Sequence, residues 1–281
     1  MKAAIVNVTG YSGMDLARLL HRHPEVQLTQ VTGRSAVGQR LGDVFPHLSD
    51  IDLVIQEEIT SSVDVVFSAL PQVASAVALI PLVEKGIKAV DISADFRLKS
   101  ASEYEEWYGV PHPRPQLLEE AVYGLTELNR EDVRSATLVA NPGCYPTSAV
   151  LALAPAIRAG IVLEDIIIDS KSGVSGAGRG LSMGVHFSEV NENVSAYSVD
   201  GHRHLPEIVQ ELRRLRSGFE PRVTFLPHLI PMTRGILSSC YVPLRDGAIA
   251  PGLAGLKEVK DLYRDAYRGE PFVRVVESSP M

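Results

Sequence analysis

Alternating strand and helix patterns in the first half of this 281-residue chain constrain its fold more than any other feature. Short apolar runs rich in β-branched residues are separated by segments whose apolar residues recur at helical spacing, for example Leu16, Leu19 and Leu20. Strands are expected at residues 3–8, 26–32, 63–70, 88–92 and 137–140. Strands that alternate with helices predict βαβ units, and therefore an α/β fold with a parallel sheet covered on both faces.

The second half has a different rhythm. Helices are expected at residues 146–158 and 205–215 and around 256–263, with strands at 162–169, 223–230 and 235–242. The last two strands are expected to be neighbours. This pattern is α+β, and the chain is longer than one typical domain of about 150 residues. We therefore expect two domains, 1–143 and 144–281, the second of them α+β.

Composition excludes several classes of partner. The formal net charge is −7, which does not support binding to nucleic acid or to an anionic membrane, because both need a basic face. The apolar runs are shorter than the ~18 residues of a membrane span. The two cysteines, Cys144 and Cys240, cannot form a disulfide framework, which favours a reducing, cytoplasmic compartment.

A glycine-containing turn lies between the first expected strand and the first helix. Backbone N–H groups in such a turn can approach a pyrophosphate, whose charge is favoured at a helix N-terminus. The alternative is an ordinary strand-to-helix turn with no ligand. The candidate cofactor-binding residues are Thr9, Gly10, Tyr11, Ser12 and Gly13.

The end of the second expected strand favours NADP over NAD. An acidic residue is usual there for the 2′-hydroxyl of NAD, but this chain has Arg34 and Ser35. A guanidinium pairs well with a 2′-phosphate. A solvated surface arginine is the alternative interpretation. With this turn, the first domain is predicted to be a Rossmann-like NADP(H)-binding domain.

Cys144 is the candidate nucleophile. It follows a Pro-Gly turn at a strand end and directly precedes a helix, where the helix dipole favours a thiolate. The alternative, a buried core cysteine, suits Cys240 better, because Cys240 lies within an apolar strand. His202 and His204, in a turn before a helix, are candidate bases. No third ligand accompanies them at a suitable spacing, so no metal is expected.

Two further segments complete the predicted site. Arg97 follows a strand end on the ligand-binding side of an open α/β sheet, where it could hold a phosphate or carboxylate. The loop of residues 172–180 is rich in glycine and could bring its backbone close to a ligand.

At these residues the sequence resembles the N-acetyl-γ-glutamyl-phosphate reductase family, relatives of the aspartate-semialdehyde dehydrogenases. The matching motifs are Thr9–Gly13, Asp95–Arg97, Asn141–Thr147, Ser175–Arg179, His186–Asn193 and Gly201–Ile208. They follow the family order over nearly the whole chain, and the block around Cys144 is the most specific of them.

The resemblance implies a reaction of arginine biosynthesis. Cys144 would displace phosphate from the acyl phosphate, NADPH would reduce the resulting thioester to the semialdehyde, and His202 or His204 would act as acid/base. A homo-oligomer, dimer or tetramer, is implied as well. The resemblance further assigns Arg97, Ser93, Asn141, Glu189 and Arg203 to the substrate, and Ser175, Gly176 and Gly178 to the cofactor.

The sequence departs from the family pattern at two places. Asn7 replaces the first glycine of the nucleotide turn. Family members also continue beyond residue 281 with a strand and a helix that return to the nucleotide domain. Without this segment, cofactor binding is expected to be weaker.

One alternative function is the related reductase that acts on carrier-protein-linked aminoadipyl or glutamyl phosphate, but the negative net charge gives no indication of a basic surface for an acidic carrier. Another is a catalytically silent NADP-binding protein, which would need neither Cys144 nor the two histidines.

Overall fold

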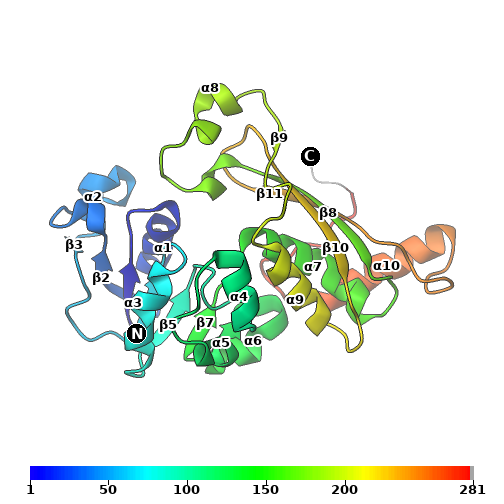
Figure 1. Ribbon diagram of the computed structural model, residues 1–281, viewed down its shortest axis with the longest axis horizontal. Coiled ribbons are helices and arrows are strands. Elements are labelled where there is room, and N and C mark those ends of the chain that lie inside the picture. The colour runs from blue at the N-terminus through cyan, green and yellow to red at the C-terminus, as the bar shows by residue number, and fades with distance from the viewer. Residues whose placement is uncertain (279–281) are drawn as a thin grey trace. The chain divides into compact units, whose positions relative to one another are not determined.

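The computed structural model describes residues 1–278, which fall into two compact units. The first comprises Met1–Gly143 with Ala177–Leu181, and the second comprises Cys144–Gly176 with the described residues from Ser182 on. Each unit is built around its own sheet (Figure 1). The short segment Ala177–Leu181 therefore packs with the first unit, although it lies in a loop whose two ends belong to the second.

The first unit contains a seven-stranded, entirely parallel sheet in the order β3-β2-β1-β4-β5-β7-β6. The order reverses between β1 and β4, and ligands of open α/β sheets bind beyond the carboxyl ends of the strands at such a point. The strands are β1 (Lys2–Val6), β2 (Gln27–Thr32), β3 (Ile55–Gln56), β4 (Val65–Ser68), β5 (Lys88–Asp91), β6 (Val122–Tyr123) and β7 (Leu138–Ala140). The helices are α1 (Tyr11–His21), α2 (Leu41–Val44), α3 (Ala74–Val83), α4 (Ala101–Tyr108), α5 (Gln116–Glu120) and α6 (Thr126–Ser135), with 3-10 turns η1 (Arg34–Ala36) and η2 (Pro46–Leu48).

Both faces of this parallel sheet are buried, as the apolar strand runs predict. Successive residues of a strand point to opposite faces. Ala3 and Ile5 belong to the core that contains Ala17 of α1, whereas Ala4 belongs to the core that contains Leu79 of α3. All five are fully buried. The Rossmann-like α/β fold expected for the first half is confirmed.

The second unit contains a mixed sheet of four strands in the order β11-β8-β10-β9. Along β8, Ile166 and Ile168 are buried while Ile167 between them is 52% exposed, so only one face of the sheet is covered. The strands are β8 (Asp165–Ser172), β9 (Ser195–Ala196), β10 (Arg222–Leu229) and β11 (Ile236–Tyr241). The helices are α7 (Cys144–Arg158), α8 (Phe187–Val190), α9 (Leu205–Arg214) and α10 (Gly252–Ala266), with 3-10 turns η3 (Val174–Ala177) and η4 (Met183–Val185). The expected α+β character is confirmed.

The expectation that the strands near 223–230 and 235–242 are neighbours is wrong. Both strands form, but β8 lies between them, parallel to β10 and antiparallel to β11. The reason is α9, which lies between β8 and β10 in the chain and makes them the two strands of a crossover unit. β11 then pairs with the other edge of β8. None of the helices in residues 1–278 has the length and apolar character that crossing a membrane requires.

Candidate functional site

The nucleotide turn is held in a left-handed conformation at Asn7, whose φ is +67°. Asparagine tolerates this region better than other residues with a side chain. Its amide Nδ2 donates to the carbonyl of Ala69, 2.9 Å away, at the end of β4, and its Oδ1 accepts from Thr9 Oγ1 at 3.3 Å. Asn7 therefore ties the turn to the loop that follows β4.

Two glycines of the turn have different roles. A Cβ on Gly13 would lie 2.3 Å from the carbonyl oxygen of Asn7, so only glycine lets α1 pack this closely on the turn. A Cβ on Gly10 would meet no atom within 4 Å. No contact within the protein requires a glycine at position 10, and the space beside it at the α1 N-terminus fits a phosphate group that approaches the backbone. The turn thus fits a dinucleotide.

Arg34 and Ser35 begin η1 directly after β2. Ser35 Oγ donates to Thr9 Oγ1 at 3.3 Å, so the end of β2 is connected to the nucleotide turn. The side chain of the exposed Arg34 makes no hydrogen bond or ion pair with another residue in the described part of the chain. Its guanidinium is available for an anionic ligand.

Three of the predicted substrate-binding residues meet at the carboxyl end of β5. Ser93 Oγ donates to the buried carboxylate of Asp91 at 2.6 Å, and the backbone N–H of Asn141 donates to the Asp91 carbonyl at 2.8 Å. Arg97 is only 6% exposed; its Nε donates to the Asn141 carbonyl and its Nη2 to the Ile92 carbonyl, both at 2.8 Å. Arg97 therefore fixes the segment that leads into Cys144.

Asp91 at the centre of this group is fully buried. Burial raises the pKa of its carboxyl to about 6, although hydrogen bonds from Ser75 and Ser93 lower it and the neighbouring Asp95 raises it further. Asp95 is also fully buried and accepts hydrogen bonds from Tyr104 Oη and from the backbone N–H groups of Val73 and Ala76 at the start of α3. The two carboxylates therefore connect the carboxyl end of β5 to the start of α3.

Cys144 is the first residue of α7, and it is exposed. α7 is 15 residues long, so the positive end of its helix dipole lies beside the thiol. Cys240 lies within β11 and is partly buried; burial raises the pKa of its thiol to about 11. The two thiols therefore differ in their surroundings as the sequence predicts.

His202 is enclosed by aromatic rings. Its ring centroid lies 5.5 Å from that of Tyr145, 5.7 Å from that of Tyr197 and 5.5 Å from that of Phe225. Its Nδ1 accepts the backbone N–H of His204 at 3.0 Å, so the neutral ring carries its proton on Nε2. Burial, with the nearby charge of Arg203, lowers the pKa of His202 to about 4. His202 is thus held neutral at pH 7.

His204 lies beside His202 and occupies the N-cap position of α9, with 4.8 Å between the two imidazole centroids. Its ring also contacts that of Tyr145, at 5.9 Å. Because Tyr145 follows Cys144 directly, these contacts bring both predicted histidines to the N-terminus of α7. Arg203, between them in the chain, has an exposed side chain.

Sequence reasoning missed the two tyrosines of this cluster. Their hydroxyls lie 2.6 Å apart. Burial raises the pKa of both tyrosines, and either hydroxyl can be the donor in the hydrogen bond between them. The negative charge of a Cys144 thiolate raises the pKa of both tyrosines further. The position of Tyr145 next to Cys144 could have indicated its role, whereas nothing in the sequence pattern marks Tyr197.

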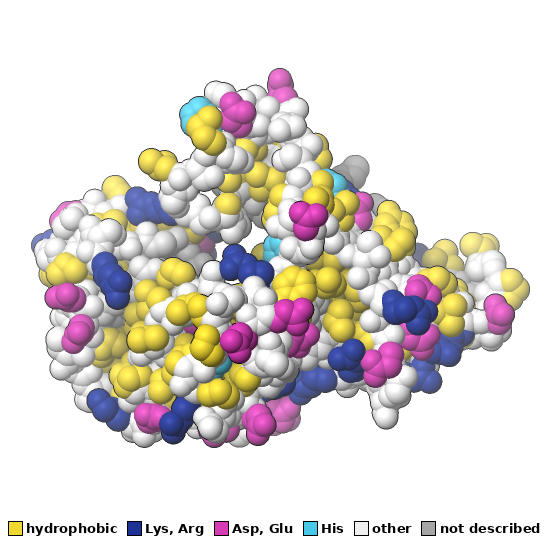
Figure 2. Space-filling model, in the orientation of Figure 1, with side chains coloured by type: hydrophobic (Ala, Val, Ile, Leu, Met, Phe, Trp, Pro, Cys, Tyr) yellow, Lys and Arg dark blue, Asp and Glu magenta, His cyan; other side chains and the backbone are white. Residues whose placement is uncertain are grey.

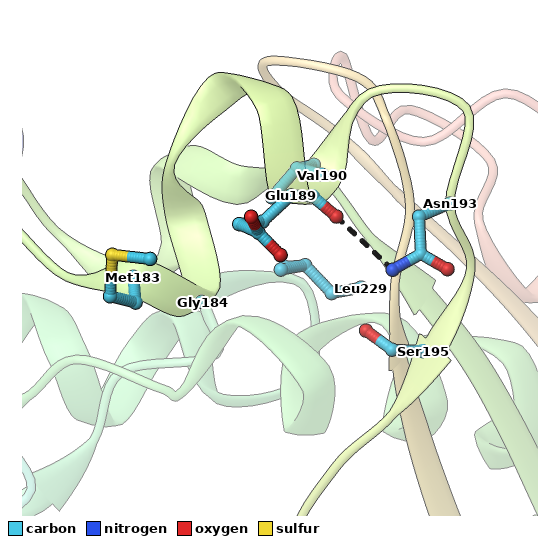
Figure 3. A pocket seen from close by; sticks show the side chains of 7 residues that line it. All are labelled: Met183, Gly184, Glu189, Val190, Asn193, Ser195 and Leu229. Atoms are coloured by element: carbon cyan, nitrogen blue, oxygen red, sulfur yellow. Dashed lines mark hydrogen bonds between the residues drawn. The ribbon is translucent and has the colours of Figure 1, made fainter.

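Glu189 lies elsewhere in the second unit. It lines a cavity of about 320 Å³, which Figure 3 shows between α8, β9 and the end of β10. Asn193 Nδ2 donates to the Glu189 carbonyl at 3.1 Å across this cavity. Neither Cys144 nor either histidine lines it. The lining residues are Met183, Gly184, Glu189, Val190, Asn193, Ser195 and Leu229.

The glycine-rich loop after β8 is divided between the units. Ser175 and Gly176 belong to the second, where the Ser175 N–H donates to the Thr233 carbonyl at 3.0 Å. Gly178, with φ +86°, belongs to the short segment that packs with the first unit. Within residues 1–278 no three His, Cys, Asp or Glu side chains are grouped to hold a metal ion.

Comparison with known proteins gives matches over nearly the whole chain. The family model described as semialdehyde dehydrogenase, NAD binding domain, matches residues 2–136, and that described as semialdehyde dehydrogenase, dimerisation domain, matches residues 144–281. An N-acetyl-γ-glutamyl-phosphate reductase from Dehalococcoides mccartyi is 53% identical over 279 residues, which are 99% of this chain and 80% of that protein. One from Geobacillus kaustophilus is 47% identical over 98% of this chain and 79% of its own length.

The solved structures show the same fold at low identity. Aspartate semialdehyde dehydrogenase II from Vibrio cholerae superposes with a TM-score of 0.67 at 18% identity, covering 93% of this chain and 78% of that one. Aspartate semialdehyde dehydrogenase with NADP from Candida albicans superposes with a TM-score of 0.64 at 17% identity, covering 94% and 76%.

Proposed function

Because the chain belongs to the semialdehyde dehydrogenase family, we propose that it reduces N-acetyl-γ-glutamyl phosphate to N-acetylglutamate semialdehyde and phosphate, with NADPH as reductant, in arginine biosynthesis. The names of relatives about 50% identical support this substrate over a carrier-linked one. They also support an active enzyme over a silent NADP-binding protein. The observation that carries the proposal is the exposed Cys144 at the start of α7, beside the cluster of His202, His204 and Tyr145.

The proposed chemistry begins at the thiol. Cys144 Sγ attacks the acyl carbon, and the bond from that carbon to the phosphate oxygen breaks. Inorganic phosphate departs, and the acyl group stays bound to Cys144 as a thioester. The N-terminus of α7 stabilises the Cys144 thiolate before it attacks, and again when the aldehyde product departs and the thiolate forms anew. NADPH, when bound, supplies the hydride that converts the thioester to the aldehyde.

We assign different roles to the two histidines. His202 is neutral and fixed, because its Nδ1 accepts the His204 N–H and its ring is packed among aromatic side chains. This arrangement suits a positioning role for His202 and leaves His204 as the proton donor and acceptor. For the phosphate, the guanidinium of Arg97 is the candidate partner, because its contacts with the Asn141 and Ile92 carbonyls hold it at the carboxyl end of β5.

We further propose that the enzyme is a homo-oligomer, a dimer or a tetramer. The second unit matches a model described as a dimerisation domain. Large hydrophobic side chains are also exposed around α8 and β9 (Figure 2), and these are Met183, Phe187, Val194 and Val199. Exposed apolar patches commonly mark protein interfaces. We expect the enzyme to act in the cytoplasm, where Cys144 and Cys240 stay reduced.

The test is the reaction in reverse. With N-acetylglutamate semialdehyde as substrate, NADP reduction should require inorganic phosphate, and Cys144→Ser should lower kcat by several orders of magnitude. Cys240→Ser is the matched control and should keep nearly full activity, because Cys240 lies within β11. Equal losses in the two variants would indicate damage to the fold and would overturn the assignment of Cys144. Phosphate-independent turnover would overturn the acyl-phosphate chemistry.

A further inference from the structure

A second arginine reaches the nucleotide turn from a distant part of the sequence. Arg179 lies in the segment Ala177–Leu181, which packs with the first unit. Its Nη1 donates to the Thr9 carbonyl at 3.1 Å, and its guanidinium carbon lies 4.8 Å from the centre of the Phe45 ring. Phe45 is only 5% exposed, so this ring is a fixed support.

Both contacts place Arg179 on the side of the turn that faces the end of β2. Phe45 belongs to the connection between β2 and β3, and Thr9 also accepts a hydrogen bond from Ser35 in that connection. In doubly wound sheets the pyrophosphate lies at the N-terminus of the first helix, whereas the adenosine ribose is recognised at the end of the second strand. Arg179 therefore lies on the ribose side of the cofactor site.

The charges of Arg34 and Arg179 indicate which group of the cofactor they bind. Neither Arg34 nor Arg179 forms an ion pair with a carboxylate anywhere in the described residues 1–278. Two guanidinium groups without a counterion match a phosphomonoester, which carries about −1.5 to −2 charges at neutral pH. A 2′-hydroxyl, as in NAD, carries no charge and would neutralise neither of them.

We propose that Arg179 is a second determinant of NADP specificity, and that it binds the 2′-phosphate together with Arg34. The segment Ala177–Leu181 already packs with the first unit, and the phosphate then holds it there through Arg179. This inference rests on the proposed use of NADPH, but it concerns nucleotide recognition alone and can be tested without the acyl phosphate.

The experiment compares adenosine 2′,5′-bisphosphate with adenosine 5′-monophosphate by isothermal titration calorimetry on the full chain. Arg179→Ala should weaken binding of the bisphosphate about tenfold and leave the monophosphate unchanged, because one charge-assisted contact at an exposed site is lost. Arg40→Ala is the matched control, since Arg40 is an exposed arginine of the same unit that pairs with Asp52. It should leave the binding of both nucleotides as in the unmodified protein.

Two further measurements use a double variant and trypsin cleavage. Arg34→Ala with Arg179→Ala should weaken bisphosphate binding by an amount that differs from the product of the single effects, because the two arginines share one phosphate. The bisphosphate, but not the monophosphate, should slow trypsin cleavage after Arg179. Equal weakening of both nucleotides, or no change in either, would overturn the proposal. Bisphosphate binding that weakens as expected in a protein without reductase activity would overturn the proposed function alone.

Discussion

Asn7 shows how a single substitution can be accommodated at a demanding position. The left-handed φ of +67° is one that glycine adopts freely and asparagine accepts at a smaller penalty than other side chains. The amide also makes a contact that glycine cannot make, its hydrogen bond to the Ala69 carbonyl. The sequence alone marks this residue only as a departure from the family pattern, whereas the geometry shows that it joins the end of β1 to the loop after β4.

Replacing Asn7 should separate these two contributions. Asn7→Gly keeps the conformation and loses the hydrogen bond, so the free energy of unfolding should fall by about 1 kcal/mol. Asn7→Ala loses the bond and also places a Cβ at positive φ, so the fall should be larger, about 2–3 kcal/mol in all. Urea denaturation of the two variants measures the difference. If alanine and glycine destabilise equally, backbone strain is not what selects the residue at position 7.

At the scale of elements, long periodic segments could be predicted and short or non-local ones could not. The strands at residues 2–6 and 88–91 and the helix at 205–214 lie within a few residues of their expected bounds, because each carries its own apolar period. β3 and β6 contain two residues each, too few to show a period. The placement of β8 between β10 and β11 depends on pairing across the chain, which no local pattern contains.

The same distinction holds for the candidate site. Cys144 and the two histidines could be named as candidates from the sequence, because residue type and position beside a helix already indicate their chemistry. Tyr197 could not, because its partner Tyr145 is 52 positions away and β9, which precedes it, has only two residues. The contacts of Arg179 with Thr9 and Phe45 depend on folding in the same way, since 170 positions separate Arg179 from Thr9.

The turn that enters α9 should make stability depend on pH. The pKa of His202 is about 4 in the folded protein, below its ordinary value of 6.5, so between these values the unfolded chain binds a proton that the folded chain does not. The contribution of His202 to stability should therefore be complete above pH 6.5 and decline as the pH falls toward 4.

His202→Gln tests this dependence. Glutamine retains an acceptor for the His204 N–H but has no imidazole to titrate. In urea denaturation between pH 4.5 and 7.5, the stability difference between the unmodified protein and the variant should shrink toward low pH. A difference that stays constant over this range would show that His202 is not the group that titrates.

At the scale of the whole molecule, each unit has its own sheet and its own core, which sets how the protein responds to ligand. The first unit holds the nucleotide turn, Arg34 and the segment with Arg179, while the second holds Cys144 and both histidines. Proteins built from separate cores commonly unfold in more than one step. A nucleotide that binds only the folded first unit should therefore stabilise that unit selectively.

Differential scanning calorimetry should show two transitions, of which adenosine 2′,5′-bisphosphate raises one. At a concentration one hundred times its Kd, a ligand stabilises the unit that binds it by about 2.7 kcal/mol. Arg34→Ala should reduce this shift at the same ligand concentration, because its weaker binding lowers the ratio of ligand to Kd. Inorganic phosphate at equal concentration is the control and should leave the nucleotide-dependent transition nearly unmoved. A single transition that shifts as a whole would show instead that the two units unfold together, since the ligand would then stabilise both cores through one cooperative equilibrium.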